Sequence, residues 1–562
     1  MRRSVGVILS ITGTLAVTLA LAFSLTGGFR VPAAQAATGT DTGTGVEVSA
    51  AVQHDVSPPL RDMHAAPLLP TIHGDRPLRL LPSGPGGASP QTPGALQTTT
   101  GPQVATTNGL NFNGVGDTSN TPSNPCNCAP PDTNGAVGAT QYVQWVNTAF
   151  AVYNKSTGAL APGFPKAGNV LWQGFGGGCA SNNDGDPIAQ YDKIAQRWVM
   201  TQFSVSTTPF LQCVAVSQTS DATGAYNRYA FSYGNTQFND YPKLGVWPDG
   251  YYITYNIFNN GQTFAGTKVC AFDRASMLTG AAATQQCFQL SSSFGGLLPS
   301  DLDGATSTLG AGGAGLPPAG TPNLLLNFGT NTLNLWKFHV DWATPGNTTL
   351  TGPTSIGVAA FTAACNGGGT CIPQPGTNNK LDSLADRLMY RLAYRHAADG
   401  HESLVVNQSV YISGNRKNQV TGVRWYELRN PAGGTMSTGT PVVYQQGTFS
   451  PDGTSRWMGS IAQDKLGDTA LGYSASSGSV FPSLRYTGRA PGDPLGTMQA
   501  ETTIFAGPAS QTGSLHRWGD YSAMSVDPVD DCTFWYTNEY IPSTGSFNWS
   551  TRIANFKFTG CA

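Results

Sequence analysis

Charged residues are scarce in this sequence. They make up 11% of the 562 residues, whereas an average soluble protein has about 25%. The formal net charge is only -2, so the chain lacks the positive field that attracts nucleic acid, and we expect no nucleic-acid partner. No run of Glu, Lys and Leu has heptad spacing, which argues against coiled coils and helical bundles.

Several catalytic motifs are also missing. With 7 histidines in the chain, no His-x-x-x-His or His-Glu-x-x-His pattern occurs, and there is no Gly-x-Ser-x-Gly elbow or phosphate-binding loop. The pair His401-Glu402 is either a base with its orienting carboxylate or, more commonly for such a pair, a solvated turn. His516 precedes Arg517, and it either reaches the mouth of a central funnel or is likewise a solvated residue.

Glycine, proline and aromatic residues are plentiful by contrast. The chain has 69 Gly and 38 Pro, and 10% of its residues are aromatic. From Cys126 onward, short β-like runs alternate with turns rich in Gly, Asn, Asp and Pro. This composition is typical of all-β extracellular proteins.

The first 37 residues have the pattern of a signal peptide. Arg2 and Arg3 precede the apolar run Val5–Leu25, and Ala34-Gln35-Ala36 fits a cleavage site. We therefore expect cleavage after Ala36 or Ala37 and secretion, with an uncleaved anchor as the alternative. No later stretch is long and apolar enough to predict a membrane span in the mature chain.

The ten cysteines all follow this segment, and their even number predicts disulfides, which persist in exported proteins. A zinc site is the alternative, but the spacing of Cys and His residues does not fit one. Sequence does not fix the connectivity. Neighbour pairing suggests three bonds, namely Cys270 with Cys287, Cys365 with Cys371, and Cys532 with Cys561.

Composition divides the rest of the chain in two. Residues 38–125 are rich in Thr, Gly, Pro, Ala and Ser, which predicts a largely disordered linker. The apolar piece Val56–Leu60 either docks onto the main domain or is part of this linker. Residues 126–562 form the predicted β domain.

A recurring unit organises the β domain. It opens with a polar turn containing Asp, continues as a strand, turns at Gly or Asp, and closes on an aromatic strand. Clear examples are 186–201, 241–254 and 520–536, and comparable units start near Thr140, Asp303, Arg387 and Arg456. About seven units at a spacing of about 45–75 residues predict a β-propeller with seven four-stranded blades. Six or eight blades and a pair of β-sandwiches are the alternatives.

In a propeller the first strand of each blade lines the central channel, so residues that open the units should face the axis. These positions are unusually polar for strand starts. They include Asp132, Asp184, Asp186, Asp240, Tyr241, Lys243, Asp301, Asp303, Arg387, Arg391, Arg456, Trp457, Arg517, Trp518, Asp520 and Tyr521.

One interpretation of these positions is an acidic-sugar site. Arginines from different blades would bind carboxylates bidentately, with Asp186, Asp240 or Asp520 as acid or base and Tyr241 or Tyr521 as nucleophile or proton donor. The expected substrate-binding residues are Arg387, Arg391, Arg456, Arg517, Trp457, Trp518 and Lys243. The other interpretation is that each Arg pairs with an Asp to hold neighbouring blades together.

The second chemistry considered is calcium binding. The loops Asn182–Asp186 and Asp301–Gly304 are rich in oxygen donors, with Asp184, Asp301 and Asp303 as the candidate ligands. Neither loop has the spacing of an EF-hand, and Asp-Gly turns are also ordinary hairpin turns. A structural calcium is therefore the alternative to no cofactor.

The units Gly185–Trp198 and Arg517–Ser522 resemble those of secreted bacterial propellers of the broad sialidase type. The segment Ser450–Trp457 matches the Ser, Asp and Trp of the sialidase Asp box, although its Gly453 comes one position early. The resemblance implies a propeller over about residues 130–560 and an arginine-containing site, and it assigns no catalytic residue. Sialidases have six blades, which differs from the repeat count here.

These observations predict a secreted glycan-active enzyme, with a glycoside hydrolase on an acidic extracellular polysaccharide as the leading hypothesis. A polysaccharide lyase acting on a uronate-containing glycan is the nearest chemical alternative. A carbohydrate- or protein-binding propeller without catalysis is the alternative from another class. We expect a monomer.

Overall fold

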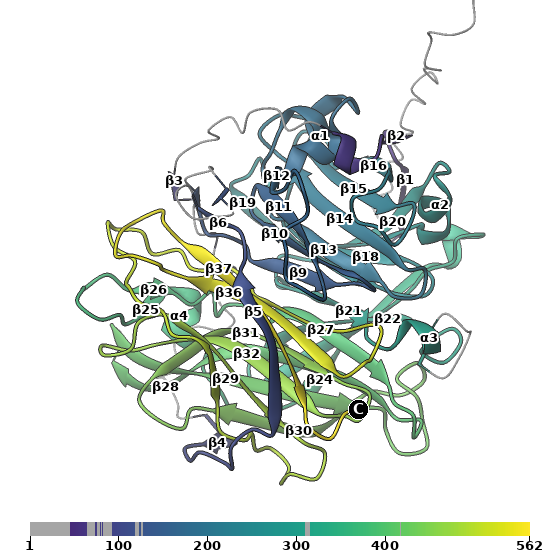
Figure 1. The fold of residues 1–562 in the computed structure, drawn as a ribbon. Coiled ribbons are helices and arrows are strands. Elements are labelled where there is room, and N and C mark those ends of the chain that lie inside the picture. Colours follow the sequence, from purple (N-terminus) through teal and green to yellow (C-terminus); the bar gives the residue numbers. More distant parts are fainter. Residues whose placement is uncertain are drawn as a thin grey trace, which may run out of the picture. The chain divides into compact units, whose positions relative to one another are not determined.

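The computed structural model describes residues 45–63, 74–75, 79, 81, 93–117, 123–124, 128–309, 315–415 and 417–562. The expected signal peptide, residues 1–37, and Cys126 lie outside these ranges. The described chain is all-β, with many antiparallel sheets and only short helices (Figure 1). The longest helix is α2, Arg274–Thr279, and the others are α1 (Gly177–Ser181), α3 (Thr306–Leu309), α4 (Ala364–Gly368), η1 (Leu60–Asp62), η2 (Gly168–Trp172) and η3 (Pro345–Asn347).

The sheets are built from meanders, in which consecutive strands pair with each other. The first three meanders are β9 (Asn134–Val137), β10 (Gln141–Val146), β11 (Ala149–Asn154) and β12 (Lys166–Ala167); β13 (Ile188–Asp192), β14 (Arg197–Ser204), β15 (Leu211–Ser217) and β16 (Tyr226–Ser232); and β17 (Gln237–Val246), β18 (Tyr251–Asn259), β19 (Thr263–Phe272) and β20 (Thr284–Gln289).

The later meanders follow the same pattern. They are β21 (Leu298–Leu302), β22 (Asn323–Gly329), β23 (Thr332–His339) and β24 (Thr349–Gly357); β27 (Met389–His396), β28 (Glu402–Asn415), β29 (Asn418–Arg429) and β30 (Val442–Phe449); β31 (Ser455–Gln463), β32 (Thr469–Ser476), β33 (Ser483–Arg489) and β34 (Thr502–Phe505); and β35 (Ala523–Val526), β36 (Thr533–Tyr540) and β37 (Ser550–Phe558). The two-residue strands β3 (Gly74–Asp75), β6 (Gly116–Asp117), β7 (Ser123–Asn124), β8 (Cys128–Ala129) and β26 (Leu381–Asp382), with the three-residue β25 (Thr370–Ile372), form small separate pairs.

The first strands of successive meanders contact one another. The contacts run from β9 to β13, β17, β21, β27, β31 and β35, and β35 contacts β9 again. Between β21 and β27 the contact is a short parallel ladder, which joins two meanders into one nine-stranded sheet. Residues that open these strands are therefore brought close together even though they are far apart in the sequence.

Aromatic side chains pack between the sheets. The rings of Tyr142 in β10 and Trp535 in β36 stack with their centroids 5.2 Å apart. Trp198 on β14 and Trp425 on β29 are also fully buried. Burial of such large apolar faces between sheets is the main stabilisation that this composition provides.

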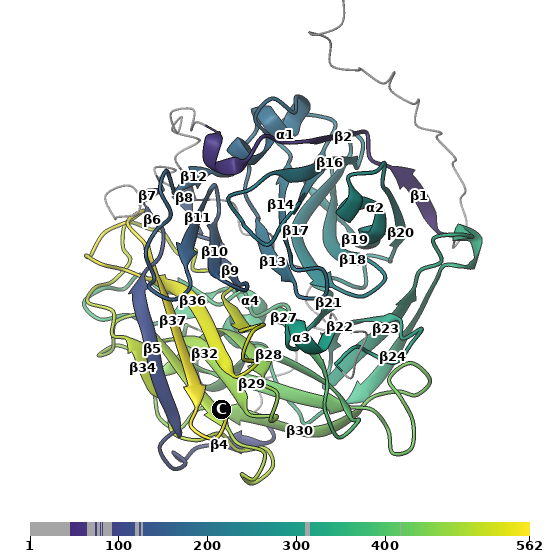
Figure 2. The same ribbon diagram turned by 45° about the vertical axis from the view of Figure 1, so that its right-hand side comes forward.

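Within residues 38–125, where a largely disordered linker was expected, the described stretches 45–63 and 93–117 contribute edge strands. Strands β1 (Glu47–Ala50), β2 (Gln53–Val56) and β4 (Leu96–Gln97) pair with β20, β16 and β30. Strand β5 (Thr106–Asn113) pairs with β37 (Figure 2). An outer strand offers an unpaired row of backbone groups, so an extended segment can bind there with few apolar side chains of its own. Of the two alternatives for Val56–Leu60, docking holds, because Leu60 is fully buried.

Four disulfides lie in the described residues. Three are the neighbour pairs suggested by the sequence, Cys270–Cys287, Cys365–Cys371 and Cys532–Cys561. The fourth, Cys179–Cys213, links α1 to β15. No helix in the described ranges is long and apolar enough to cross a membrane.

Candidate functional site

Eight of the polar residues singled out in the sequence gather where the first strands begin. We call them the strand-start cluster: Asp186, Asp240, Tyr241, Lys243, Arg387, Arg517, Asp520 and Tyr521. They come from the segments that lead into or lie within β13, β17, β27 and β35. Their catalytic and binding roles remain predictions.

Two tyrosines lie at the middle of this cluster. The rings of Tyr241 and Tyr521 meet edge to face, with centroids 5.9 Å apart. The backbone N–H of Tyr241 donates to the Asp186 carboxylate at 3.2 Å, and its hydroxyl donates to the carbonyl oxygen of Asp520 at 3.4 Å. Tyr241 thereby connects three first strands.

A buried lysine packs against both rings. Lys243 Nζ lies 3.5 Å from the ring centroid of Tyr241 and 3.9 Å from that of Tyr521. Burial lowers the pKa of Lys243 to about 7, although the nearby carboxylates of Asp186 and Asp132 oppose this shift. The two ring faces partly replace the water that its ammonium group loses.

The two arginines of the cluster are already paired with carboxylates. Arg387 lies 4.3 Å above the Tyr241 ring and binds Asp386 through Nε at 2.7 Å and Nη2 at 3.0 Å. Arg517 pairs with Asp520 and, at 3.3 Å, with Asp382. These pairs are buried. Arg387–Asp386 and Arg517–Asp520 each lie within one segment, whereas Arg517–Asp382 joins β26 to the segment that leads into β35.

Asp186 and Asp240 are the carboxylates of the cluster that stay partly open to solvent. Partial burial and, secondly, the negative charge of Asp186 together raise the pKa of Asp240 to about 6, whereas Arg79 and Arg387 oppose the shift. Burial raises the pKa of the neighbouring Asp382 to about 8. A carboxyl group that keeps its proton near neutral pH can act as a general acid.

The backbone at these positions has an unusual conformation. Asp132, Asp186, Tyr241 and Asp520 all have positive φ, at 50°, 43°, 54° and 59°. Non-glycine residues rarely adopt this conformation, and several such residues at equivalent strand starts indicate a constraint on where their side chains point. The register of β17 also shifts between Asp240 and Lys243, which re-aims the intervening Tyr241.

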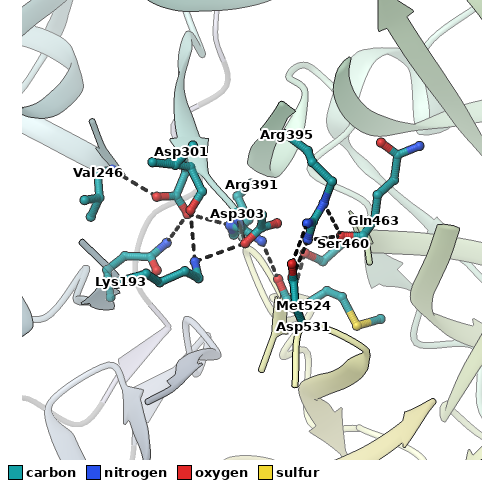
Figure 3. Close-up of polar contacts among 12 residues, drawn as sticks. Lys193, Val246, Asp301, Asp303, Arg391, Arg395, Ser460, Gln463, Met524 and Asp531 are labelled. Atoms are coloured by element: carbon teal, nitrogen blue, oxygen red, sulfur yellow. Dashed lines mark hydrogen bonds and ion pairs between the residues drawn. The ribbon is translucent and has the colours of Figure 1, made fainter. Parts of the chain in front are cut away.

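Three other candidates lie in a separate cluster that ties first strands together (Figure 3). Arg391, expected to bind substrate, pairs with Asp301 at 2.6 Å and Asp303 at 2.7 Å, both expected as metal ligands. Lys193 pairs with Asp303 at 3.0 Å. Burial opposes the shift, but Arg391 and Lys193 lower the pKa of Asp303 to about 2. We call Lys193, Asp301, Asp303 and Arg391 the clamp cluster, because its ion pairs join β21, β27 and the loop after β13.

The remaining candidates lie elsewhere. Arg456 binds Glu501 and Asp452, both close to its own meander. Trp457 and Trp518 are fully buried, with ring centroids 5.7 Å apart. The carboxylate of Asp184 accepts hydrogen bonds from the backbone of Val205 and Ser206. No group of three His, Cys, Asp or Glu residues within the described ranges is placed to hold a metal ion.

Three residues that pair with the cluster were not predicted from the sequence, namely Arg79, Asp382 and Asp386. Arg79, from the segment expected to be a linker, pairs with Asp240 at 3.3 Å. It lies in the run Pro77-Leu78-Arg79-Leu80-Leu81, which follows other apolar residues, Leu68, Leu69 and Ile72. No signal in the sequence sets this run apart from them.

No protein-family model matches the chain, and no curated protein matches it. Among solved structures, it is similar to the WD40 domain of SCAP from fission yeast, with 7% identity over 75% of this chain and 82% of that chain and a TM-score of 0.31. A polysaccharide lyase, an ulvan lyase, has 11% identity over 74% of this chain and 92% of its own, with a TM-score of 0.32. An exo-β-1,3-galactanase from Clostridium thermocellum has 11% identity over 72% and 86%, with a TM-score of 0.30. These TM-scores are low, so a function can be inferred only from the residues of the site.

Proposed function

We propose that this chain is a secreted glycan-active enzyme that hydrolyses an acidic polysaccharide at the strand-start cluster. We further propose that its meanders are the seven blades of a β-propeller. The observation that carries the functional proposal is the pair of partly solvent-open carboxylates, Asp186 and Asp240, beside cationic side chains. Glycoside hydrolysis needs two carboxyl groups with different protonation states at one site.

In this proposal Asp240 is the general acid. Its pKa of about 6 leaves it largely protonated in mildly acidic conditions, so it can donate a proton to the oxygen of the leaving sugar. Asp186 is the general base that takes a proton from water, whose oxygen bonds to the anomeric carbon as the glycosidic bond breaks.

Arg387 is the group proposed to bind the acidic sugar. It uses Nε and Nη2 for Asp386 and the backbone of Arg79, and its Nη1 has no acceptor among the residues that the structure describes. A guanidinium N–H donated to a sugar carboxylate makes a charge-assisted hydrogen bond. This preference distinguishes an acidic from a neutral glycan.

The test is a degradation screen on neutral, uronate-containing and sialylated polysaccharides, with wild type, Asp240→Asn and Asp221→Asn. Asp221 is the matched control, because it pairs with Arg61 of the N-terminal segment at 3.2 Å, much as Asp240 pairs with Arg79. We expect new reducing ends from an acidic glycan, a loss of about 10²–10⁴-fold in Asp240→Asn, and little change in Asp221→Asn.

The same screen separates the alternatives. Unsaturated products with ultraviolet absorbance would make the chain a lyase. A folded protein that degrades no glycan in the panel would favour the binding module, whose arginines serve the fold. Equal loss of activity in both variants would contradict the role assigned to Asp240.

A further inference from the structure

Arg79 is held by both charge and aromatic contact. Its guanidinium carbon lies 4.2 Å from the ring centroid of Phe238 and 5.5 Å from that of Phe258. Its Nη1 pairs with Asp240 at 3.3 Å. A carboxylate beside two aromatic rings is a recognition site for a guanidinium group.

The backbone around Arg79 is bound as well. Arg387 Nη2 donates to the Arg79 carbonyl oxygen at 3.2 Å, and the N–H of Leu81 donates to Asp386 at 2.7 Å. Asp386 and Arg387 therefore bind each other and also bind one backbone carbonyl and one backbone N–H of the segment that contains Arg79 and Leu81. These backbone contacts add to the ion pair between Arg79 and Asp240.

The side chain of Leu81 fills a place that two glycines leave open. Leu81 is 5% exposed. A Cβ added to Gly295 would come within 3.0 Å of Leu81 Cδ1, and one added to Gly296 within 3.1 Å. A side chain at either glycine would compete with Leu81 for this space.

We propose that the strand-start cluster, with Phe238, Phe258 and Asp386, is a binding site for a peptide that has an arginine followed two residues later by a leucine. In this structure the chain's own Arg79 and Leu81 fill it. Because the arginine of the peptide pairs with Asp240, it competes with the glycan for the general acid. The competition rests on the proposed function, whereas the peptide site does not.

The first test uses binding alone. The variant Arg79→Ala/Leu81→Ala empties the site, and a blocked synthetic peptide Pro-Leu-Arg-Leu-Leu-Pro is titrated by calorimetry into this variant and into wild type. We expect the peptide to bind the variant and to bind wild type at least tenfold more weakly. A peptide with Ala in place of Arg should not bind the variant. Absent or equal binding by both proteins, at unchanged circular dichroism, would overturn the proposal.

A second test keeps the native segment and does not depend on that variant folding. Trypsin cleavage after Arg79 is compared with cleavage after Arg61 in wild type, Asp240→Asn and Asp221→Asn. We expect Asp240→Asn to speed cleavage after Arg79 several-fold and leave Arg61 unchanged, with the reverse pattern in Asp221→Asn. Identical effects of the two substitutions at both sites would contradict specific recognition of Arg79.

Activity then separates the two proposals. If the glycan reaction occurs, Arg79→Ala/Leu81→Ala should lower its KM severalfold, and the peptide added in trans should restore the wild-type value. Peptide binding without glycan activity would support the peptide site and contradict the proposed enzyme activity. Glycan activity without peptide binding would support the enzyme activity and contradict the peptide site.

Discussion

At the scale of single residues, the arginines of this protein fall into two electrostatic environments. Arg391 is 2% exposed and pairs with Asp301 and Asp303. Its guanidinium group is therefore neutralised by buried carboxylates of the protein itself. Arg387 binds Asp386 and a peptide carbonyl, and the two N–H bonds of its Nη1 have no acceptor among the described residues. The two residues are four positions apart, yet only one of them belongs to the proposed site.

Removal of Arg391 should therefore damage stability. Arg391→Ala leaves Asp301 and Asp303 buried with only Lys193 as a cationic partner of Asp303, which should lower the free energy of unfolding by about 3–5 kcal/mol. Guanidinium denaturation measures this change. Arg61→Ala, which breaks a solvent-exposed pair, is the control and should cost about 1 kcal/mol or less; similar losses in both variants would refute the clamp.

The pH dependence of activity follows from Asp240. A general acid acts only when protonated, so kcat/KM should fall as pH rises through about 6, the pKa of Asp240. Arg79 opposes the upward shift of this pKa, so Arg79→Ala should move the falling limb to higher pH. A pH–rate profile of both proteins checks the direction, and a limb that stays in place would mean that another group sets it.

The sequence identified most residues of the strand-start cluster because each stands at the opening of a repeat. It did not separate them from Arg456 and Trp457, which open a unit in the same way. The register shifts both in β17, between Asp240 and Lys243, and in β31, between Trp457 and Ser460. Alternate residues share a face only in a regular strand, and neither shift leaves a clear mark in the sequence, so counting residues does not give the side-chain directions.

At the scale of elements, the edge strands show how a polar, flexible-looking segment becomes ordered. The N–H of Val52 donates to the Ala230 carbonyl at 2.8 Å, and that of Ala51 donates to Ala283 at 2.9 Å. Residues 38–125 have few apolar side chains, and this composition predicts disorder. Composition does not take account of the backbone hydrogen bonds that the edges of β16 and β20 offer.

A proline placed between β1 and β2 tests this contribution. Val52→Pro removes the N–H that binds Ala230 and should lower the free energy of unfolding by about 1–3 kcal/mol. Val52→Ala keeps the N–H, and because this side chain is half exposed, it should change little. The midpoints of thermal denaturation of the two variants measure this difference. Equal midpoints would show that the edge strand does not stabilise the fold.

The Cys532–Cys561 disulfide should matter more than the Cys365–Cys371 disulfide. The first spans 29 residues and the second 6, and the chain entropy lost on closing a loop grows with its length. Replacing the first pair by alanine should cost about 3–4 kcal/mol, and replacing the second about 2 kcal/mol. Denaturation of both double variants measures the two losses in the free energy of unfolding. A larger loss for the Cys365–Cys371 variant would contradict the prediction.

At the scale of the whole described chain, the sequence predicted the repeats but not how they are completed. The predicted unit starts near 186, 241, 303, 387, 456 and 520 each lie within or close to the first strand of a meander, whereas the start predicted near Thr140 lies between β9 and β10. The pairing of β5 with β37 could not be predicted from the sequence. The two segments share no motif, and their pairing depends on β37 being left as an unpaired edge strand when the meanders have packed.

The β5–β37 pairing also sets an order of events during biosynthesis. The N–H of Leu110 bonds to the side chain of Asn555, across 445 positions of the chain. Strand β5 is synthesised long before its partner, so the sheet that contains both cannot close until β37 has been made. A nascent chain that stalls before β37 keeps β5 unpaired and leaves an open edge on β36, which makes truncated chains the form most prone to aggregate.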